Sequence, residues 1–195
     1  MDLMSLKSFF INTLQEMFQT VLISLVIYFI VTIFFVQPHR VRGESMVPNF
    51  ADSELLLTEK VTYRLYKPAR GDVIVFKAPG PRNADFIKRI IGLPGENVKI
   101  EGGVISINNQ KLLEPYETQQ TQSSINVTLG DNQYFVLGDN RGSSSDSRVF
   151  GPIAKDSIRG RAWLVYFPIL KTSKSQGARI VSRVNYSIPD TFNDR

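Results

Sequence analysis

Cysteine is absent from the sequence and histidine occurs only once, as His39, so several kinds of catalytic site are excluded at the outset. Without cysteine the chain can form no disulfide, thiolate nucleophile, zinc knuckle or iron–sulfur cluster. One histidine is too few for a histidine-based metal site, and any Ser–His–Asp triad would have to use His39. The sequence also lacks a GxSxG elbow, an HExxH helix and a Gly-rich phosphate-binding loop. We therefore expect no metal and no cofactor.

Excess charge is small, with a formal net charge of +5 over 195 residues. In residues 1–40, Lys7 and Arg40 balance Asp2 and Glu16, so the whole excess lies in residues 41–195. A mildly basic domain suits an anionic membrane surface as well as nucleic acid, and the net charge does not choose between them.

One long hydrophobic run lies near the N-terminus. Residues 17–38 carry no charged side chain, and Val21–Val36 is almost wholly apolar. About 20 helical residues cover the hydrocarbon core of a bilayer. The alternatives are a buried core helix and a cleaved signal peptide, but a signal peptide has a shorter apolar stretch and a small-residue cleavage site. The sequence predicts a retained transmembrane helix over residues 17–37, preceded by a cytoplasmic segment of residues 1–16 and ended by Pro38.

The orientation of this anchor is weakly encoded. Lys7 precedes the span, whereas Arg40 and Arg42 follow it, which slightly favours a cytoplasmic C-terminus. Long C-terminal domains cross the membrane largely regardless of such charges, so this bias decides little.

The rest of the chain has the pattern of a mainly β domain. Short runs rich in Val, Ile, Phe and Tyr alternate with Gly, Pro, Asn and Asp turn signals. Asn108-Asn109 after Val104–Ile107 indicates a hairpin. We predict antiparallel strands within a domain of residues 38–170, a solvated loop at Thr118–Ser124, and a C-terminal tail of residues 171–195 entered through a linker at Lys171–Gly177. The predicted strands are Glu54–Leu57, Val73–Phe76, Phe86–Ile91, Val98–Ile100, Val104–Ile107, Tyr134–Leu137 and Trp163–Phe167.

Three short segments hold unusual combinations of reactive side chains. The first, Gly43-Glu44-Ser45-Met46-Val47-Pro48, directly follows the anchor. A flexible glycine two residues before Ser45 and a rigid proline three residues after it can expose a hydroxyl on a turn. Taken alone, an ordinary surface turn explains this segment as well.

The second segment, Asp85–Gly92, places a lysine on an apolar strand face. In a strand, Phe86, Lys88 and Ile90 share one face. Burial there would lower the pKa of Lys88, and a lysine that is neutral near pH 7 is a general base. The simpler alternative is that the lysine stem packs on its neighbours while the amine reaches water.

The third segment, Gly138–Gly151, packs hydroxyls, carboxylates and arginines after a hydrophobic strand. It indicates either a hydrogen-bonded network around a site or a polar loop held by Asp–Arg pairs. Considered together, the three segments favour catalysis. A serine nucleophile in a chain with one histidine needs another base, and a lysine on an apolar face supplies it, as in the Ser–Lys variant of the triad.

These segments resemble the bacterial type I signal peptidases, which are membrane-anchored serine proteases that remove signal peptides from exported proteins. The similarity spans roughly residues 38–168. Any one motif is a weak signal, whereas four in the family's order behind one anchor are specific. The four motifs are Ser45–Pro48, Arg70–Phe76, Lys88–Glu96 and Gly138–Gly151.

The resemblance implies a role for individual residues. It makes Ser45 the nucleophile and Lys88 the general base. It assigns Ser144 to orienting the lysine, and Asp146 and Arg148 to structural support of the site. It also implies an antiparallel β fold of the signal-peptidase and LexA-like type.

The sequence departs from the family at three motif positions. Asn49 stands where the family usually has Thr, Glu96 where Asp is commoner, and Gly43 where some members have a Ser that helps to bind the oxyanion. The backbone N–H of Ser45 remains as one oxyanion donor, and a second donor is left open.

The expected reaction is peptide-bond hydrolysis through an acyl-enzyme, with the substrate bound as an extended strand beside a sheet edge. The family implies cleavage after small residues at −1 and −3, and the candidate pocket walls are Val41, Phe50, Val75 and Ile87. We expect signal-peptide-bearing precursors and membrane lipid as partners, no nucleic acid, and a catalytic domain on the extracytoplasmic side of the cell membrane.

Two other functions are compatible with parts of this pattern. A self-cleaving repressor-type Ser–Lys domain would carry a DNA-binding helical region, but the first 40 residues here form an anchor instead. A non-catalytic, membrane-tethered β domain that binds exported polypeptides would lack a serine that reacts with acylating probes.

Overall fold

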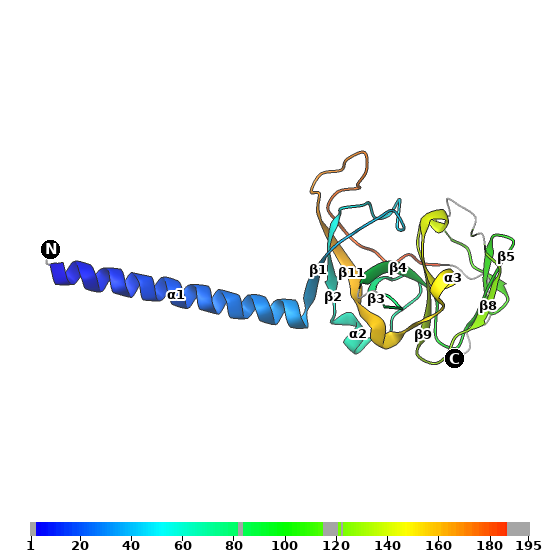
Figure 1. Cartoon of the computed structure of the whole chain (residues 1–195), viewed down its shortest axis with the longest axis horizontal. Coiled ribbons are helices and arrows are strands. Elements are labelled where there is room, and N and C mark those ends of the chain that lie inside the picture. The colour runs from blue at the N-terminus through cyan, green and yellow to red at the C-terminus, as the bar shows by residue number, and fades with distance from the viewer. Residues whose placement is uncertain (1–2, 82–83, 115–120, 122, 187–195) are drawn as a thin grey trace. The chain divides into compact units, whose positions relative to one another are not determined.

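The computed structural model describes residues 3–81, 84–114, 121 and 123–186 (Figure 1). The chain divides into two compact units, Met1–Gln37 and Pro38–Arg195. The first unit is helical and the second is mainly β, as the sequence predicts.

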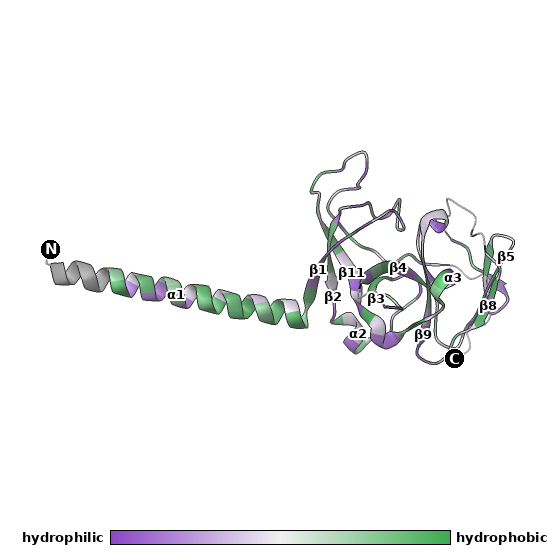
Figure 2. Cartoon of the chain, viewed as in Figure 1, coloured by the Kyte–Doolittle hydropathy of each residue, from purple (hydrophilic) through white to green (hydrophobic). Residues whose placement is uncertain are grey.

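The first unit is built on one long helix, α1 (Leu3–Phe34), which is hydrophobic along most of its length (Figure 2). The part long and apolar enough to cross a membrane is Phe10–Phe34, so it begins earlier than the span expected at residues 17–37. The hydroxyls of Thr20, Ser24 and Thr32 donate to carbonyls one turn back within the helix. Such internal pairing is what a helix needs in lipid, where no water can satisfy polar groups.

The helix ends before the residues that lead to Pro38. Proline has no N–H and disfavours a helical conformation at the residue before it. Val36–Arg40 accordingly forms an extended strand, β1, rather than the last turn of the helix.

The second unit contains one large antiparallel sheet with the strand order β1-β2-β11-β3-β4-β9-β10, to which β12 adds by pairing with β11. The site motifs lie on or beside β1, β3, β4 and β9. Besides β1, the strands of this large sheet are β2 (Leu55–Glu59), β3 (Val73–Lys77), β4 (Asp85–Gly92), β9 (Gln133–Leu137), β10 (Ile153–Ala154), β11 (Ile158–Phe167) and β12 (Arg179–Ile180).

A second, smaller antiparallel sheet has the order β7-β6-β5-β8. Its β6–β7 hairpin turns at Asn108 and Asn109, which both have positive φ, as the sequence predicts for this dipeptide. Its strands are β5 (Asn97–Glu101), β6 (Val104–Ile107), β7 (Gln110–Lys111) and β8 (Ile125–Thr128).

Short helical turns complete the second unit. They are α2 (Thr62–Leu65), η1 (Arg141–Ser143), α3 (Ser147–Phe150) and η2 (Lys155–Ser157). All seven predicted runs coincide with strands, whereas β1, β7, β8, β10 and β12 were not predicted from the sequence. The predicted loop at Thr118–Ser124 lies largely outside the described residues.

Apolar side chains from the strands form three buried clusters. One joins the two sheets and includes Ile91, Ile100 and Phe135. A second lies beneath the turn that carries Ser45 and includes Met46, Phe50, Val73 and Val75. The third packs on the other face of β3 and β4 around Ile74, Phe76 and Ile90. From Lys88 to Gly92, the strand that carries this lysine is therefore buried on both faces.

The segment after residue 170 is not the linker that its composition suggested. Its residues up to 186 pack on the β domain: β12 pairs with β11, and Ser175 is buried with its hydroxyl on Glu54. A run of small residues such as Ser and Gly is typical of a linker, but in this segment they make hydrogen bonds to buried groups of the domain. Residues 187–195 of the predicted tail lie outside the described residues.

Candidate active site

Ser45 lies on a turn between β1 and β2 that is anchored from below. Gly43 adopts a φ of +82°, which suits glycine, and its N–H donates to Asp52 at 2.7 Å. After Ser45 the chain turns toward the core, and Met46 and Phe50 are buried in the second apolar cluster described above. The turn is therefore held by its apolar neighbours while Ser45 stays partly exposed at its edge.

Lys88 reaches Ser45 from the middle of β4. Its Nζ donates to Ser45 Oγ at 2.8 Å and to the carbonyl of Ile87 at 2.9 Å, and it lies 5.4 Å from the centre of the Phe86 ring. The lysine is only 4% exposed, so its amine does not extend to bulk water. The alternative, in which the lysine stem packs on its neighbours while the amine reaches water, is therefore wrong.

Burial sets the charge state of this lysine. Desolvation lowers the pKa of Lys88 to about 8, against the opposing fields of the Asp146 and Asp139 carboxylates. A substantial fraction of the amine is then neutral at mildly alkaline pH and can accept a proton from a neighbouring hydroxyl.

A buried ion pair holds the sequence motifs together. Arg89, the residue after Lys88, makes two hydrogen bonds to the Asp139 carboxylate, at 2.8 and 2.7 Å. Arg89 also donates to the carbonyl of Gly71 at 2.9 Å. Asp139 also accepts from the side chain of Asn49 at 2.9 Å. One arginine and one aspartate thus connect the serine, lysine and two further motifs.

The Gly138–Gly151 segment also contacts the serine turn directly. Asn140 donates its N–H to the carbonyl of Ser45 at 3.0 Å and its side chain to the carbonyl of Glu44 at 3.1 Å. A Cβ at Gly138 would lie 2.5 Å from the Ser45 carbonyl oxygen and 2.2 Å from Ser144 Oγ. Glycine at this position is therefore required by the close approach of two backbones.

Asp146 and Arg148 form the internal support of this segment. Asp146 is fully buried and accepts two bonds of 2.8 Å from the Arg148 guanidinium and one of 3.0 Å from the N–H of Gly138. Burial by itself would raise the pKa of Asp146, but these hydrogen bonds outweigh it and the pKa is lowered. The carboxylate is therefore ionised at neutral pH.

Ser144 lies beside this support but is not bonded to the lysine. Its Oγ is buried and makes no hydrogen bond of good geometry within the described part of the chain, although the hydroxyl is near enough to Asp146 to help lower the pKa of that carboxyl. The neighbouring Ser145, rather than Ser144, lines the groove described next.

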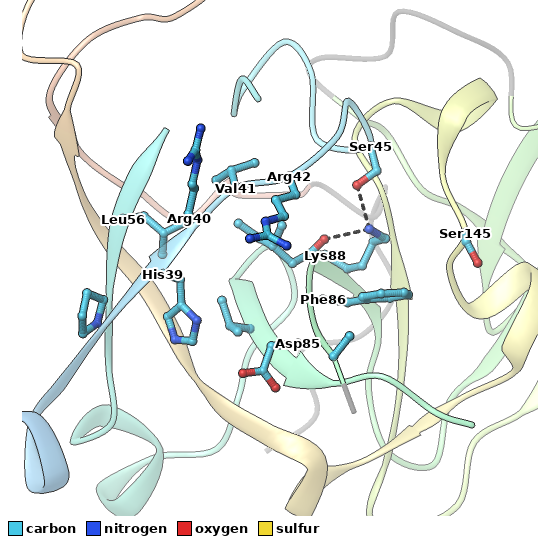
Figure 3. A pocket seen from close by; sticks show the side chains of 14 residues that line it. His39, Arg40, Val41, Arg42, Ser45, Leu56, Asp85, Phe86, Lys88 and Ser145 are labelled. Atoms are coloured by element: carbon cyan, nitrogen blue, oxygen red, sulfur yellow. Dashed lines mark hydrogen bonds between the residues drawn. The ribbon is translucent and has the colours of Figure 1, made fainter. Parts of the chain in front are cut away.

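Ser45 and Lys88 lie at one end of a groove of about 680 Å³ (Figure 3). His39 and Asp85 lie at its other end. Of the four predicted pocket residues, Val41, Val75 and Ile87 line the groove, whereas Phe50 does not. Phe50 is buried in the same apolar cluster, with the Arg179 guanidinium 5.3 Å from its ring centre.

Two strand edges border the groove. On the β1 side, the N–H and C=O of Val41 bond to Glu54 and Ser53, away from the groove. On β4, the N–H and C=O of Ile90 bond toward β3, and β9 pairs only with the far half of β4, from Arg89 onward. Because backbone groups alternate in direction along an extended chain, those of Ile87, and those of Arg42 just beyond the end of β1, point into the groove. The Ile87 carbonyl there already accepts from Lys88 Nζ.

Sequence reasoning missed a second support of the serine turn. Arg179 of β12 makes bonds of 3.0 and 2.8 Å to the buried carboxylate of Glu54, and it also donates to the carbonyl of Asn49. Gln176 donates to the carbonyl of Pro48 at 3.1 Å. No local motif marks these residues, because their partners lie more than a hundred positions away in the chain.

No group of three or more His, Asp or Glu side chains that could hold a metal occurs among the described residues.

Comparison with known proteins identifies the family. The sequence model for "Signal peptidase, peptidase S26" matches residues 14–167. The signal peptidase I of Leptolyngbya laminosa is 36% identical over 170 residues, covering 81% of this chain and 82% of that protein. The signal peptidase I of Bacillus licheniformis is 33% identical over 176 residues, covering 84% and 94%, and signal peptidase IB of Staphylococcus aureus is 34% identical over 174 residues, covering 80% and 90%.

A solved structure of a signal peptidase I from Enterococcus faecalis is 33% identical and aligns with 49% of this chain and 97% of that one, with a TM-score of 0.45. The family match covers more than half of the chain, and the relatives are matched over most of their length. The chain belongs to the signal peptidase family, peptidase S26, and is therefore a peptidase with a membrane anchor.

Proposed function

We propose that this signal peptidase cleaves signal peptides from exported precursors with Ser45 as nucleophile and Lys88 as general base. The observation that carries the assignment is the 2.8 Å hydrogen bond between Lys88 Nζ and Ser45 Oγ, made by a lysine that is buried and has a lowered pKa. A nucleophile within hydrogen-bond reach of a base of suitable pKa is what acyl transfer requires.

Catalysis proceeds through an acyl-enzyme. Neutral Lys88 takes the proton of the Ser45 hydroxyl as Oγ attacks the carbonyl carbon of the scissile bond. The resulting ammonium then protonates the leaving amine, so that the peptide C–N bond breaks and the signal peptide is esterified to Ser45. Lys88, neutral again, removes a proton from water, which hydrolyses the ester and restores the serine. The backbone N–H of Ser45 stabilises the oxyanion.

The precursor binds as an extended strand between the two edges that border the groove. The backbone groups of Arg42 on one side and Ile87 on the other face the groove and support this mode, although the Ile87 carbonyl already accepts from Lys88 Nζ. Such backbone hydrogen bonding gives affinity without demanding a particular sequence. The precursor residues before the cleavage site lie along β1, from the His39 end toward Ser45.

Small residues at −1 and −3 fit the inner wall of the groove. Alternate side chains of an extended peptide point the same way, so −1 and −3 face inward together. Val41 and Val75 are buried there within an apolar cluster, and Ile87 is partly buried beside them. A large side chain at either position would have to displace packed core residues, which is costly.

Three further residues support the catalytic pair Ser45 and Lys88. Ser144 orients the lysine amine once substrate is bound, and Asp146 and Arg148 hold the segment on which it lies. No cofactor or nucleic acid takes part.

The catalytic domain lies on the extracytoplasmic side of the cell membrane, where signal-peptide cleavage sites emerge, with the N-terminal end of α1 inside. Addition of a protease to intact spheroplasts tests this placement. The expected result is digestion of residues 41–195, whereas complete protection of the domain contradicts it.

Membrane lipid is the second partner. Large apolar side chains of β11 and the following loop are exposed, among them Phe167 (53%), Ile169 (72%) and Leu170 (78%), and Ile180 of β12 adds to them (70%). Exposed apolar patches of this kind serve as interaction surfaces. Ile169→Ser with Leu170→Ser in the full chain should slow cleavage of a vesicle-bound precursor but not of a short soluble peptide; equal slowing of both substrates counts against lipid contact.

Cleavage of a model precursor by the purified full chain tests the catalytic assignment. Cleavage at one bond after a small residue, lost in Ser45→Ala, is expected. A serine-directed acylating probe should label the wild type but not Ser45→Ala. Unaltered cleavage or labelling in that variant contradicts the assignment of Ser45.

A further inference from the structure

Arg42 is an exposed arginine in the groove whose side chain the proposed mechanism does not use. It lies three residues before Ser45 and lines the groove, and its side chain is directed over the space between β1 and β4 (Figure 3). It forms no salt bridge with any residue that the structure describes. Its positive charge is therefore available to a ligand in the groove.

The charges around Arg42 leave this end of the groove positive. Arg40 donates to the hydroxyl of Ser53 at 3.0 Å and points away from the groove interior. Asp85 is the carboxylate among the groove-lining residues, but it lies at the far end beside His39, with Arg159 Nε 3.5 Å away. Glu44 is exposed on the serine turn and is not among the residues that line the groove.

The alternation of side chains along an extended substrate indicates which of its residues lies nearest Arg42. Val41 is only 3% exposed and lines the inner wall, whereas Arg42 is exposed and its side chain is directed over the groove (Figure 3). In a substrate strand whose −1 and −3 side chains face inward with Val41, the −2 side chain faces outward on the side of Arg42. The −2 residue is separated from the scissile bond by the −1 residue, and Arg42 lies three residues before Ser45 in the chain.

We propose that Arg42 is a specificity-determining residue that favours an acidic side chain, and disfavours a basic one, at precursor position −2. This inference rests on the strand-like binding mode proposed above. The guanidinium attracts a carboxylate at −2 and repels an ammonium or a second guanidinium there.

The effect should be modest because Arg42 is exposed to solvent. Exposed ion pairs correspond to roughly two- to fivefold changes in an equilibrium or rate constant. We expect Glu at −2 to raise kcat/KM over Gln by about this factor, and Lys at −2 to lower it by a similar factor. Both effects should shrink at about 1 M salt, where the Debye length falls to roughly 3 Å.

The experiment measures kcat/KM of the full chain in detergent for three precursor peptides that differ only by Glu, Gln or Lys at −2. Wild type, Arg42→Gln, Arg42→Glu and Arg64→Glu are compared. Arg64 is a matched control, because it is also exposed but lines a different pocket, so Arg64→Glu makes the same change in net charge outside the groove.

The ratio of kcat/KM for the Glu peptide to kcat/KM for the Lys peptide should exceed one in wild type and in Arg64→Glu. It should fall to near one in Arg42→Gln and below one in Arg42→Glu. A wild-type ratio of one, or equal changes of the ratio in Arg42→Glu and Arg64→Glu, overturns the inference. The uncharged Gln peptide distinguishes failure of this inference from failure of the proposed function. If the Gln peptide is cleaved at the expected bond and only the Glu/Lys ratios disagree, the inference fails while the proposed function stands.

Discussion

Lys88 Nζ donates a hydrogen bond of 2.8 Å to Ser45 Oγ although the two residues are 43 positions apart in the chain. One belongs to the turn after β1 and the other to the centre of β4, and the Arg89–Asp139 pair helps to fix their distance by bonding to both neighbouring motifs. This contact is the basis of the first two predictions.

Lys88→Arg should abolish cleavage even though it keeps a positive charge, because a guanidinium does not deprotonate in proteins. In wild type, kcat/KM should fall as the pH decreases through about 8, the lowered pKa of Lys88, because the amine becomes protonated. Single-turnover cleavage by the arginine variant and a pH profile of the wild type measure both effects. Substantial cleavage by Lys88→Arg would mean that Lys88 is not the base.

Lys88→Met should make the folded protein more stable at pH 7. The pKa of Lys88 is lowered from about 10.4 in the unfolded chain to about 8 in the folded protein. Between these values the unfolded chain binds more protons, so wild-type stability rises with pH there. Below pH 8 the buried, charged lysine lowers the free energy of unfolding by roughly 1–3 kcal/mol.

Thermal unfolding of the full chain in detergent tests this effect. The melting temperature of Lys88→Met should exceed that of wild type at pH 7, and the difference should narrow toward pH 10. Lys77→Met, which changes an exposed lysine on β3, is the control and should show no such pH-dependent gain. A less stable Lys88→Met at pH 7 would contradict the prediction.

Ser144→Ala should reduce kcat less than Ser45→Ala or Lys88→Ala. Without the contact that Ser144 is proposed to make with the lysine once substrate is bound, the base is still correctly placed part of the time, whereas loss of either catalytic residue removes the chemistry. Steady-state kinetics of the three variants decide the order. Wild-type activity of Ser144→Ala would reject the role of Ser144, and Ser145, which lines the groove, would be tested next.

Asp146→Asn should destabilise the domain by roughly 3 kcal/mol, because removing one partner of a buried ion pair leaves the other charge uncompensated. The pKa of Asp146 is lowered in the folded protein, so its contribution is complete above the unfolded value of about 3.9 and is lost as the pH falls through the folded value. Melting temperatures between pH 2 and pH 7 should therefore depend less on pH in the variant. Asp156→Asn, on the exposed turn η2, is the matched control, and equal effects of both changes would argue against the assignment.

Arg179→Ala should lower both stability and kcat. It leaves the buried Glu54 carboxylate unpaired, which costs roughly 2–4 kcal/mol, and it removes the contact with Asn49 on the serine turn. Arg183→Ala is the comparison, because Arg183 also joins the C-terminal segment to a buried carboxylate, Asp72, but does not touch the serine turn. If the two variants lose kcat equally, Arg179 has no particular role in holding the turn.

The strands were predictable because their signal is local. Runs such as Val73–Phe76 and Tyr134–Leu137 are continuous and β-branched or aromatic, and each is bounded by turn residues. Of the five missed strands, β7, β10 and β12 are two residues long and β1 contains Pro38 and His39, so these four carry no hydrophobic pattern. They form only because a neighbouring strand offers free backbone groups.

The sequence by itself determined the membrane anchor, the β class of the domain and the residue types available for catalysis, because apolar run length, strand pattern and the scarcity of histidine and cysteine are properties of the chain. Tertiary structure decided which lysine meets which serine, that Arg89 and Asp139 join the motifs, that Phe50 lies under Arg179 instead of lining the groove, and that the C-terminal segment secures the serine turn. These depend on side chains brought together from distant positions, and burial, which lowers the pKa of Lys88, exists only once the sheets have packed.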